Sequence, residues 1–211
     1  MTLMLCDLSH SRRSHDTSIR TFTGRSFWPL DPRPEEVDIE DIAHALSLIC
    51  RFTGHTYCFY SVADHSLRVS RLAEQMTMAE PGAPALRAKA ARQMALWGLL
   101  HDASEAYLCD VPSPLKRAPG FGGLYRRHES TLMDAIKARF NLPPHEPAVV
   151  KHADRTLLNT EARDLMDVPV TDLDQWQCGY EPLPEPIFPL DPQRAEAEFL
   201  RRFRELTALN R

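Results

Sequence analysis

A histidine and an aspartate stand side by side in the stretch LLHDASE at positions 99–105. At the end of an apolar helical segment, His101 and Asp102 offer a metal ion one neutral nitrogen and one anionic oxygen. Glu105 lies four residues after His101 and three after Asp102, which on a continuous helix places it over the same surface. We expect this carboxylate to lie beside a metal ion without binding it, where it can activate a metal-bound water.

Two other helical segments contribute single residues of the same chemical kinds. His65 lies in SVADHSL, near the start of an apolar-periodic segment, and Asp154 lies in VKHADR within another. Taken alone, His65 is typical of a hydrogen-bonded core histidine. Asp154 taken alone is typical of a surface carboxylate paired with Lys151 or Arg155. The order of these residues along the chain is what favours a common function.

That order, a histidine, then His-Asp, then a distant aspartate on three helical segments, resembles the HD superfamily of metal-dependent phosphohydrolases. The chain is most similar to its bacterial and prophage branch of deoxynucleoside 5′-monophosphate phosphatases. The resemblance runs from about Phe22 to about Asp167 and rests on several ordered motifs. These are FTGRSFW at 22–28, DIAHALS at 41–47, RFTGH at 51–55, FYSVADHS at 59–66 and HDASEAYLCDVPSPLK at 101–116.

The resemblance implies a site for one divalent metal ion, with water in the open positions of the ion. The implied ligands are His65, His101, Asp102 and Asp154. Two imidazoles and two carboxylates suit Mn²⁺, Co²⁺, Fe²⁺ or Mg²⁺, and Zn²⁺ is also compatible. The implied reaction removes the 5′-phosphate of a (deoxy)nucleoside monophosphate by attack of a metal-activated water.

Two carboxylates are implied to take part in catalysis. Glu105 is placed to accept the proton of the attacking water or to hold that water in line. Asp110 lies in the family's short Asp-x-Pro-x-Pro loop and corresponds to a second catalytic or substrate-orienting carboxylate. The alternative is that Asp110 caps the following turn. Glu161 lies seven residues after Asp154 on the same helix face, and we expect it at most to support a ligand.

Cationic and aromatic residues are expected to bind the substrate. Arg51 matches the family's substrate-contacting arginine, and its planar guanidinium suits phosphate oxygens. Phe52 stands where some relatives carry tryptophan and is compatible with stacking on a base or sugar. His55 and Lys116 are expected within reach of phosphate, although Lys116 and Arg117 alternatively form a solvated pair.

Two other functions are compatible with the same residues. A deeper pocket around the same metal site would release triphosphate or pyrophosphate from a (deoxy)nucleoside triphosphate. A non-catalytic nucleotide-binding regulatory module with a decayed active site is the second alternative, and the intact ligand set and Glu105 argue against it.

Hydrophobic periodicity predicts an all-α protein. The resemblance implies a compact HD-domain helical bundle with a small N-terminal β-hairpin. The hairpin is expected at 22–28, with Gly24 at its turn. Residues 1–20 are expected to be loose, and residues 21–211 to form a single domain. Helical segments are predicted at 39–52, 62–76, 84–105, 123–140, 147–166 and 192–209, with a rigid proline loop at 110–116.

Composition narrows the class of partner. With 211 residues and a net charge of −4, the chain has no general basic character, which argues against duplex nucleic acid. No apolar run approaches the roughly 20 residues of a membrane span, and the N-terminus lacks the pattern of a secretory signal.

The five cysteines form no CxxC pair and indicate reduced thiols in a cytoplasmic protein, with Cys50 and Cys109 buried. The resemblance implies a small-molecule nucleotide as partner and allows a homodimer.

Overall fold

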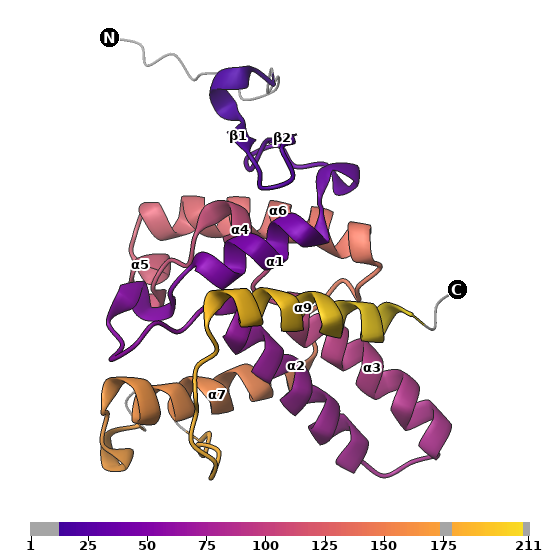
Figure 1. The fold of residues 1–211 in the computed structure, drawn as a ribbon, viewed down its shortest axis with the longest axis vertical. Coiled ribbons are helices and arrows are strands. Elements are labelled where there is room, and N and C mark those ends of the chain that lie inside the picture. The colour runs from indigo at the N-terminus through magenta and orange to yellow at the C-terminus, as the bar shows by residue number, and fades with distance from the viewer. Residues whose placement is uncertain (1–12, 174–178, 209–211) are drawn as a thin grey trace.

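The computed structural model describes residues 13–173 and 179–208, and this part of the chain is mostly helical. The expectations for residues 1–12, Cys178 and Leu209 lie outside the described residues. Figure 1 shows the helices gathered around a common core, with a two-stranded hairpin beside them. The helices are α1 (Ile39–Leu48), α2 (Val62–Ala79), α3 (Pro84–Leu100), α4 (Glu105–Leu108), α5 (Ser113–Arg117), α6 (Phe121–Phe140), α7 (Ala148–Met166) and α9 (Pro192–Thr207).

The hairpin pairs β1 (Ile19–Arg20) with β2 (Ser26–Phe27) in antiparallel register, with Ile19 opposite Phe27. Gly24 adopts a φ of 84° in the connecting loop, a conformation that glycine reaches without steric cost. The expected hairpin is therefore present, but its first strand begins at Ile19, inside the segment that the sequence indicates as loose. Phe22 lies in the loop, where its ring stacks on His44 with centroids 3.7 Å apart.

The segment before the hairpin is held by specific contacts. Arg13 forms ion pairs with Asp31 and Glu36. The indole of Trp28 donates a hydrogen bond to the carbonyl of Ser14 at 3.0 Å. A 3₁₀ turn, η1 (His15–Thr17), connects these contacts to β1, and a second turn, η2 (Pro34–Glu36), leads into α1. Ordered structure therefore begins before residue 21.

Local sequence signals account for the helix starts. Side-chain oxygens of Asp38, Ser61 and Asp191 accept hydrogen bonds from backbone amides in the first turns of α1, α2 and α9. Each of these caps satisfies an amide that has no partner inside its helix. α3, α5 and α9 each have a proline in the first turn. Proline is favourable there because the amides of the first turn have no hydrogen-bond partner inside the helix.

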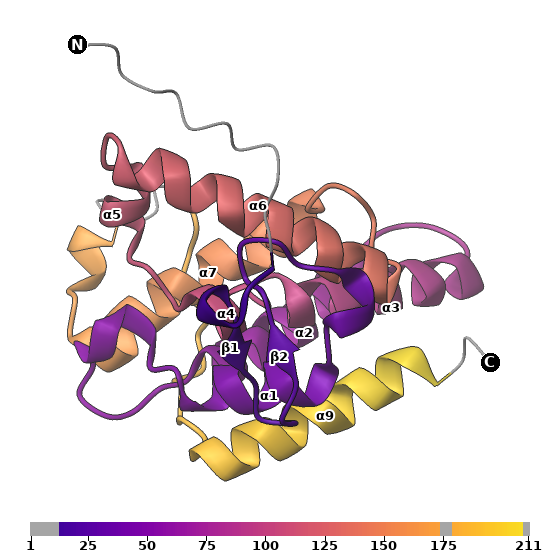
Figure 2. The same cartoon turned by 90° about the horizontal axis from the view of Figure 1, so that it is seen from above.

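The core lies where α2 meets its neighbours. Helices α2 and α3 run side by side, α7 crosses α2, and α9 packs against α1, α2 and α3 (Figures 1 and 2). Figure 2 shows α5 and α6 on the side of the molecule away from α9. The largest fully buried side chains belong to Tyr60, Phe27, Phe199, Ile42, Leu46, Leu67, Leu99, Leu100, Leu132, Ile136, Leu157 and His65.

Gly98 permits a close approach between α2 and α3. A Cβ atom at this position would lie 3.1 Å from Cα of Ser70 and 3.2 Å from the carbonyl oxygen of Val69. These separations are tighter than ordinary van der Waals contact, and both neighbours are backbone atoms of α2. The absence of a side chain at Gly98 thus allows α3, which ends just before His101, to lie close to α2, which carries His65.

Three element boundaries differ from the sequence prediction. α1 ends at Leu48, because Ile49 is extended and its carbonyl accepts a hydrogen bond from the Val62 amide. The Arg51 amide donates to the carbonyl of Tyr60 in the same way. α3 ends at Leu100, and residues 101–104 form a turn before α4 starts at Glu105. The predicted proline loop contains the short helix α5, with Pro114 in its first turn.

The described cysteines differ in part from expectation. Cys50, Cys58 and Cys109 are free thiols, but Cys109 is exposed and Cys50 is only partly buried. The prediction that Cys109 is buried was wrong: it lies just after the last residue of α4, with a φ of 66°, and its side chain is exposed. Across the described residues, no helix combines the length and the apolar character that crossing a lipid bilayer requires.

Candidate metal centre and adjoining cleft

The four residues expected to bind metal come together from separate elements. His65 lies in the second turn of α2 and is fully buried. His101 follows the last residue of α3, and Asp102 is next to it in the turn 101–104. Asp154 lies on α7, the helix that crosses α2. Residues nearly 90 positions apart in sequence therefore share one location.

The donor atoms of these residues converge. The Nε2 atoms of His65 and His101 are 3.3 Å apart. Oδ2 of Asp102 lies 3.2 Å from Nε2 of His101 and 3.8 Å from Nε2 of His65. Oδ1 of Asp154 lies 3.2 Å from Nε2 of His65 and 3.9 Å from Nε2 of His101. The donors on His65, His101 and Asp102 form a group that could hold a metal ion.

Hydrogen bonds on the far side of each ring orient the two histidines. Nδ1 of His65 is 2.6 Å from Oε1 of Glu161, and Nδ1 of His101 is 2.8 Å from the carbonyl oxygen of Gly98. Both partners are acceptors, so Nδ1 carries the proton in each ring. When the ring is neutral, Nε2 is left with its lone pair directed at the centre, which is the tautomer that binds a metal.

The separations suit a divalent cation. Donors about 2.1 Å from a small ion stand about 3.0 Å apart when they are adjacent in an octahedron. The shorter observed distances, 3.2 to 3.3 Å, are close to that value. Two unprotonated Nε2 atoms at 3.3 Å would repel each other, so this centre needs either a proton or a metal ion.

The electrostatic environment favours positive charge at this centre. Burial opposes protonation of His101, but Asp102 and Asp154 outweigh it and raise the pKa of His101 to about 10. Burial likewise opposes ionisation of Asp154, while His65 and His101 hold its pKa below the ordinary range. The carboxylates therefore remain ionised and attract a proton or a metal ion.

Glu161 is a buried anchor behind the centre. Besides His65, its carboxylate accepts hydrogen bonds from the Tyr60 hydroxyl at 2.9 Å and from Nε of Arg51 at 3.1 Å. Burial opposes its ionisation, but Arg51 and His65 hold the pKa of Glu161 below its usual value. The sequence predicted that Glu161 shares a face with Asp154 and at most supports a ligand, and the structure shows its direct bond to His65.

Glu105 reaches the site by a different route from the one the sequence indicated. It does not continue the helix of His101, because the turn 101–104 intervenes and the Glu105 amide donates to the carbonyl of Asp102 at 2.9 Å. Oε1 accepts a hydrogen bond from Nζ of Lys116 at 3.2 Å. Oε2 is buried and has no hydrogen-bond partner among the described residues. Burial, with Asp102 and Asp110 nearby, raises the pKa of Glu105 well above its ordinary value.

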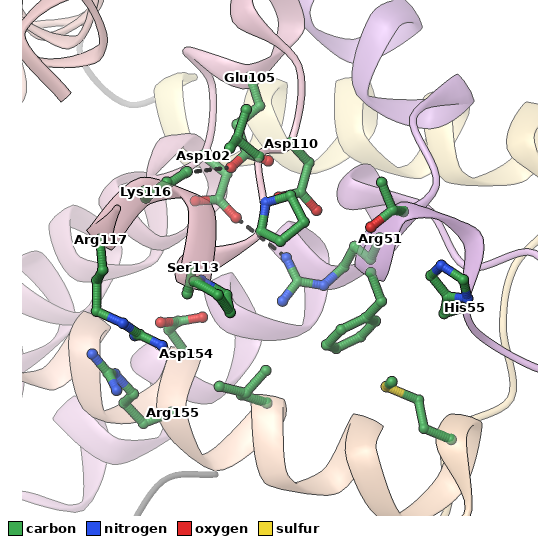
Figure 3. Close-up of a pocket in the computed structure, with 17 residues that line it drawn as sticks. Arg51, His55, Asp102, Glu105, Asp110, Ser113, Lys116, Arg117, Asp154 and Arg155 are labelled. Atoms are coloured by element: carbon green, nitrogen blue, oxygen red, sulfur yellow. Dashed lines mark hydrogen bonds and ion pairs between the residues drawn. The ribbon is translucent and has the colours of Figure 1, made fainter. Parts of the chain in front are cut away.

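Asp110 faces the same space. The N-cap position of α5 is occupied by Pro112 and no side chain caps that helix, so the capping alternative for Asp110 is not what the structure shows. Burial raises the pKa of Asp110, and Arg51 acts in the opposite direction. Figure 3 shows its carboxylate near Arg51 and Asp102.

A cleft of about 720 Å³ opens beside these groups, a size common for small-molecule sites. Figure 3 shows its walls: one from the 3₁₀ turn η3 (Arg51–Gly54), one from the segment 110–117 and one from α7. All the residues expected to bind substrate line it, namely Arg51, Phe52, His55 and Lys116. Asp102, Glu105, Asp110 and Asp154 line it as well.

Arg51 is held in place on the floor of the cleft. Its Nη1 lies 3.5 Å from Oδ2 of Asp102, and its Nε bonds Glu161 as described above. Burial opposes its charge, but Glu161 and the cleft carboxylates raise its pKa further above the ordinary value. Nη2 donates no hydrogen bond within the described residues. The guanidinium also lies over the ring of Phe52, 5.2 Å from its centroid.

The turn beside Arg51 is strained. Phe52 and Thr53 both adopt left-handed backbone conformations, with φ of 54° and 56°. Such a conformation costs a residue with a side chain roughly 1–2 kcal/mol. Strain of this kind persists where the surrounding structure imposes it and is concentrated at functional sites. The conformation places Phe52 and Thr53 in the cleft wall.

Lys116 and Arg117, which the sequence allowed as a solvated pair, have separate environments. Lys116 forms ion pairs with Glu105 and with Glu129, the latter at 2.7 Å. Arg117 is exposed and lines the cleft together with Arg155 of α7. Neither Arg117 nor Arg155 was predicted to line the site, because charge alone does not reveal which surface a side chain faces.

Comparison with known proteins gives the family. No family model matches the chain. It is 36% identical over 198 residues to the uncharacterized protein YfdR of Escherichia coli K12, which covers 92% of this chain and 97% of YfdR. This chain belongs to the YfdR family. An uncharacterized protein of Rhodobacter capsulatus is 39% identical over 147 residues, covering 68% of each chain. Because YfdR and this second relative are uncharacterized, the function of the YfdR-family chain must be argued from its site.

Proposed function

We propose that this protein is a metal-dependent phosphohydrolase of the HD superfamily that removes the 5′-phosphate of (deoxy)nucleoside monophosphates. The observation that carries the proposal is the convergence of donor atoms from four residues, His65, His101, Asp102 and Asp154. Hydrogen bonds at Nδ1 of both imidazoles hold the rings in this orientation. In both rings Nδ1 is bonded to an acceptor, so each Nε2 is turned towards Asp102 and Asp154, as it would be in a shared metal site. The adjoining cleft supplies the groups that a phosphoryl transfer requires.

The donor set of two imidazoles and two carboxylates fits a divalent ion such as Mn²⁺, Co²⁺, Fe²⁺ or Mg²⁺. When bound, such an ion supplies positive charge for phosphoryl oxygens and lowers the pKa of a coordinated water. Glu161 keeps His65 in the required tautomer through the bond to Nδ1. The carbonyl of Gly98 does the same for His101.

Glu105 is the group that accepts the proton of the attacking water. Its Oε2 has no hydrogen-bond partner among the described residues and is therefore free to receive one. Lys116 holds the opposite oxygen and keeps the carboxylate oriented. A raised pKa makes Glu105 a stronger base than an ordinary carboxylate once it is ionised. Asp110, on the neighbouring wall, orients the substrate.

Arg51 binds the scissile phosphate. Two of its nitrogens are engaged by Glu161 and Asp102, which fixes the plane of the guanidinium and leaves Nη2 as a donor for a phosphate oxygen. Phe52 and His55 line the same wall and contact the nucleoside. Lysine at position 51 would keep the charge but lose the fixed geometry.

A turnover screen tests this function. The protein is assayed with ribo- and deoxynucleoside mono-, di- and triphosphates, each with Mn²⁺, Co²⁺ or Mg²⁺ and with a chelator. We expect metal-dependent release of orthophosphate from monophosphates. The variant Asp102→Asn should lose this activity, whereas Asp134→Asn, which alters an exposed carboxylate on α6, should keep it.

Other outcomes identify the alternatives. Release of triphosphate or pyrophosphate would identify the chain as a nucleoside triphosphate hydrolase. Metal-dependent nucleotide binding without turnover of any nucleotide in the panel would show that the chain is a binding module. Absence of both binding and turnover would contradict the nucleotide assignment.

A further inference from the structure

Two arginines in the cleft have no counter-ion. Within residues 13–173 and 179–208, the guanidinium groups of Arg117 and Arg155 form no hydrogen bond or ion pair. The other two cations of the cleft differ: Arg51 is paired with Glu161 and Asp102, and Lys116 with Glu105 and Glu129. The cleft therefore contains positive charge beyond what its own carboxylates engage.

The two arginines face one another from different elements. Arg117 is the last residue of α5, and Arg155 lies on α7, one position after Asp154. Figure 3 shows both side chains extending towards one another beside Asp154, at the opposite end of the cleft from His55. Two guanidinium groups repel each other, and an anion bound between them would remove that repulsion.

We propose that Arg117 and Arg155 form a second anion subsite, which binds a second phosphate group on the nucleotide substrate. The proposal rests on the proposed function, because it places the first phosphate at the centre formed by His65, His101, Asp102 and Asp154. The metal centre accepts the 5′-phosphate of a monophosphate, and the subsite adds affinity for a nucleotide that carries a second phosphate group. Its second phosphate lies on the 3′ position of the sugar or in the 5′ phosphate chain.

The chemistry of the two side chains favours phosphate over other anions. Each guanidinium is a planar fork that donates two parallel hydrogen bonds to phosphate oxygens. Two such forks from opposite sides match a dianion with several oxygens better than a carboxylate. Arg155 is partly buried, so its contact with phosphate is less screened by solvent than a contact at an exposed surface.

Direct binding measurements test the subsite separately from catalysis. Dissociation constants are measured by calorimetry with Mn²⁺ in the Glu105→Gln background, which prevents turnover. The ligands are dAMP, 2′-deoxyadenosine 3′,5′-bisphosphate and dADP. The double variant Arg117→Gln, Arg155→Gln is compared with Arg127→Gln, which removes an exposed positive charge of α6 that does not line the cleft.

We expect the double variant to weaken binding of a two-phosphate ligand by about 10-fold or more, and binding of dAMP by a clearly smaller factor. Arg127→Gln should preserve the ratio of the two affinities. A selective loss for the bisphosphate places the second phosphate on the sugar, and a selective loss for dADP places it in the 5′ chain. The affinity for a two-phosphate ligand should also fall more steeply with salt concentration when Arg117 and Arg155 are present than in the double variant.

An equal loss for dAMP and for both two-phosphate ligands would overturn the proposal, because the arginines would then hold the first phosphate. An unchanged affinity for all three ligands would overturn it too. Failure of the proposed function is recognised separately, as absence of turnover by the wild-type chain in the nucleotide panel. Circular dichroism of the double variant confirms that it is folded.

Discussion

Glu161 accepts a hydrogen bond from Nδ1 of His65 at 2.6 Å, while Nε2 of the same ring lies 3.2 Å from Asp154, seven residues earlier on α7. One helix thus holds both sides of the imidazole. Asp154 faces the candidate metal centre, and Glu161 sets the proton on the far nitrogen. The ring can neither rotate nor change tautomer without losing one of these contacts.

Replacing Glu161 tests whether this contact matters for metal binding. Glu161→Gln keeps the size of the side chain but removes the charge that fixes the His65 proton and balances Arg51. We expect affinity for Mn²⁺ to fall by about 10–100-fold, measured by calorimetry. Glu185→Gln, at an exposed position, is the control and should bind as the unmodified protein does. Equal affinity of Glu161→Gln and the control would show that Glu161 has only a structural role.

Replacing Glu105 separates proton transfer from metal binding. Glu105→Gln retains every candidate ligand, so the rise in melting temperature on adding Mn²⁺ should persist. Without a carboxylate to accept the proton, kcat should fall by about 10²–10⁴-fold. Steady-state kinetics and thermal melting measured on the same sample check both parts. An unchanged kcat would exclude Glu105 as the base.

The pH profile should respond to Lys116. Glu105 acts as a base only when ionised, so activity is lost as the pH falls through its pKa. Burial raises that pKa and the positive charge of Lys116 lowers it. Lys116→Met removes the charge, so the acid limb of kcat/KM should move to higher pH. An acid limb that stays in place or moves to lower pH would mean that Lys116 does not act on the ionisation of Glu105.

Two glycines allow a matched test of the contact between α2 and α3. Gly98→Ala introduces a methyl group against the backbone of α2 and should lower the free energy of unfolding by about 1–3 kcal/mol. Gly123→Ala, on α6 with no atom within 4 Å of the added group, should leave stability unchanged or raise it by up to about 1 kcal/mol. Urea denaturation measures both. Equal stability of the two variants would mean that α2 and α3 separate without cost.

The residues that the sequence predicted for the site lie close together in the structure, but their surroundings were only partly predicted. The helical segments that carry His65 and Asp154 follow from periodicity and from caps such as Ser61, which are local signals. The break after Leu100 escaped prediction because LLHDASE is compatible with continuous helix. The turn at 101–104 is a tertiary outcome, and it places Glu105 on a separate helix, α4.

The sequence by itself determined the identity and order of the candidate ligands and the helical character of the chain, because these depend on residue type and short-range spacing. Only the tertiary structure decided which charges meet. It paired Lys116 with Glu105, placed Glu161 behind His65 and left Arg117 facing Arg155 without a counter-ion. Such pairings depend on how helices that are distant in the sequence pack together. The distance between two side chains in space cannot be deduced from their separation along the chain.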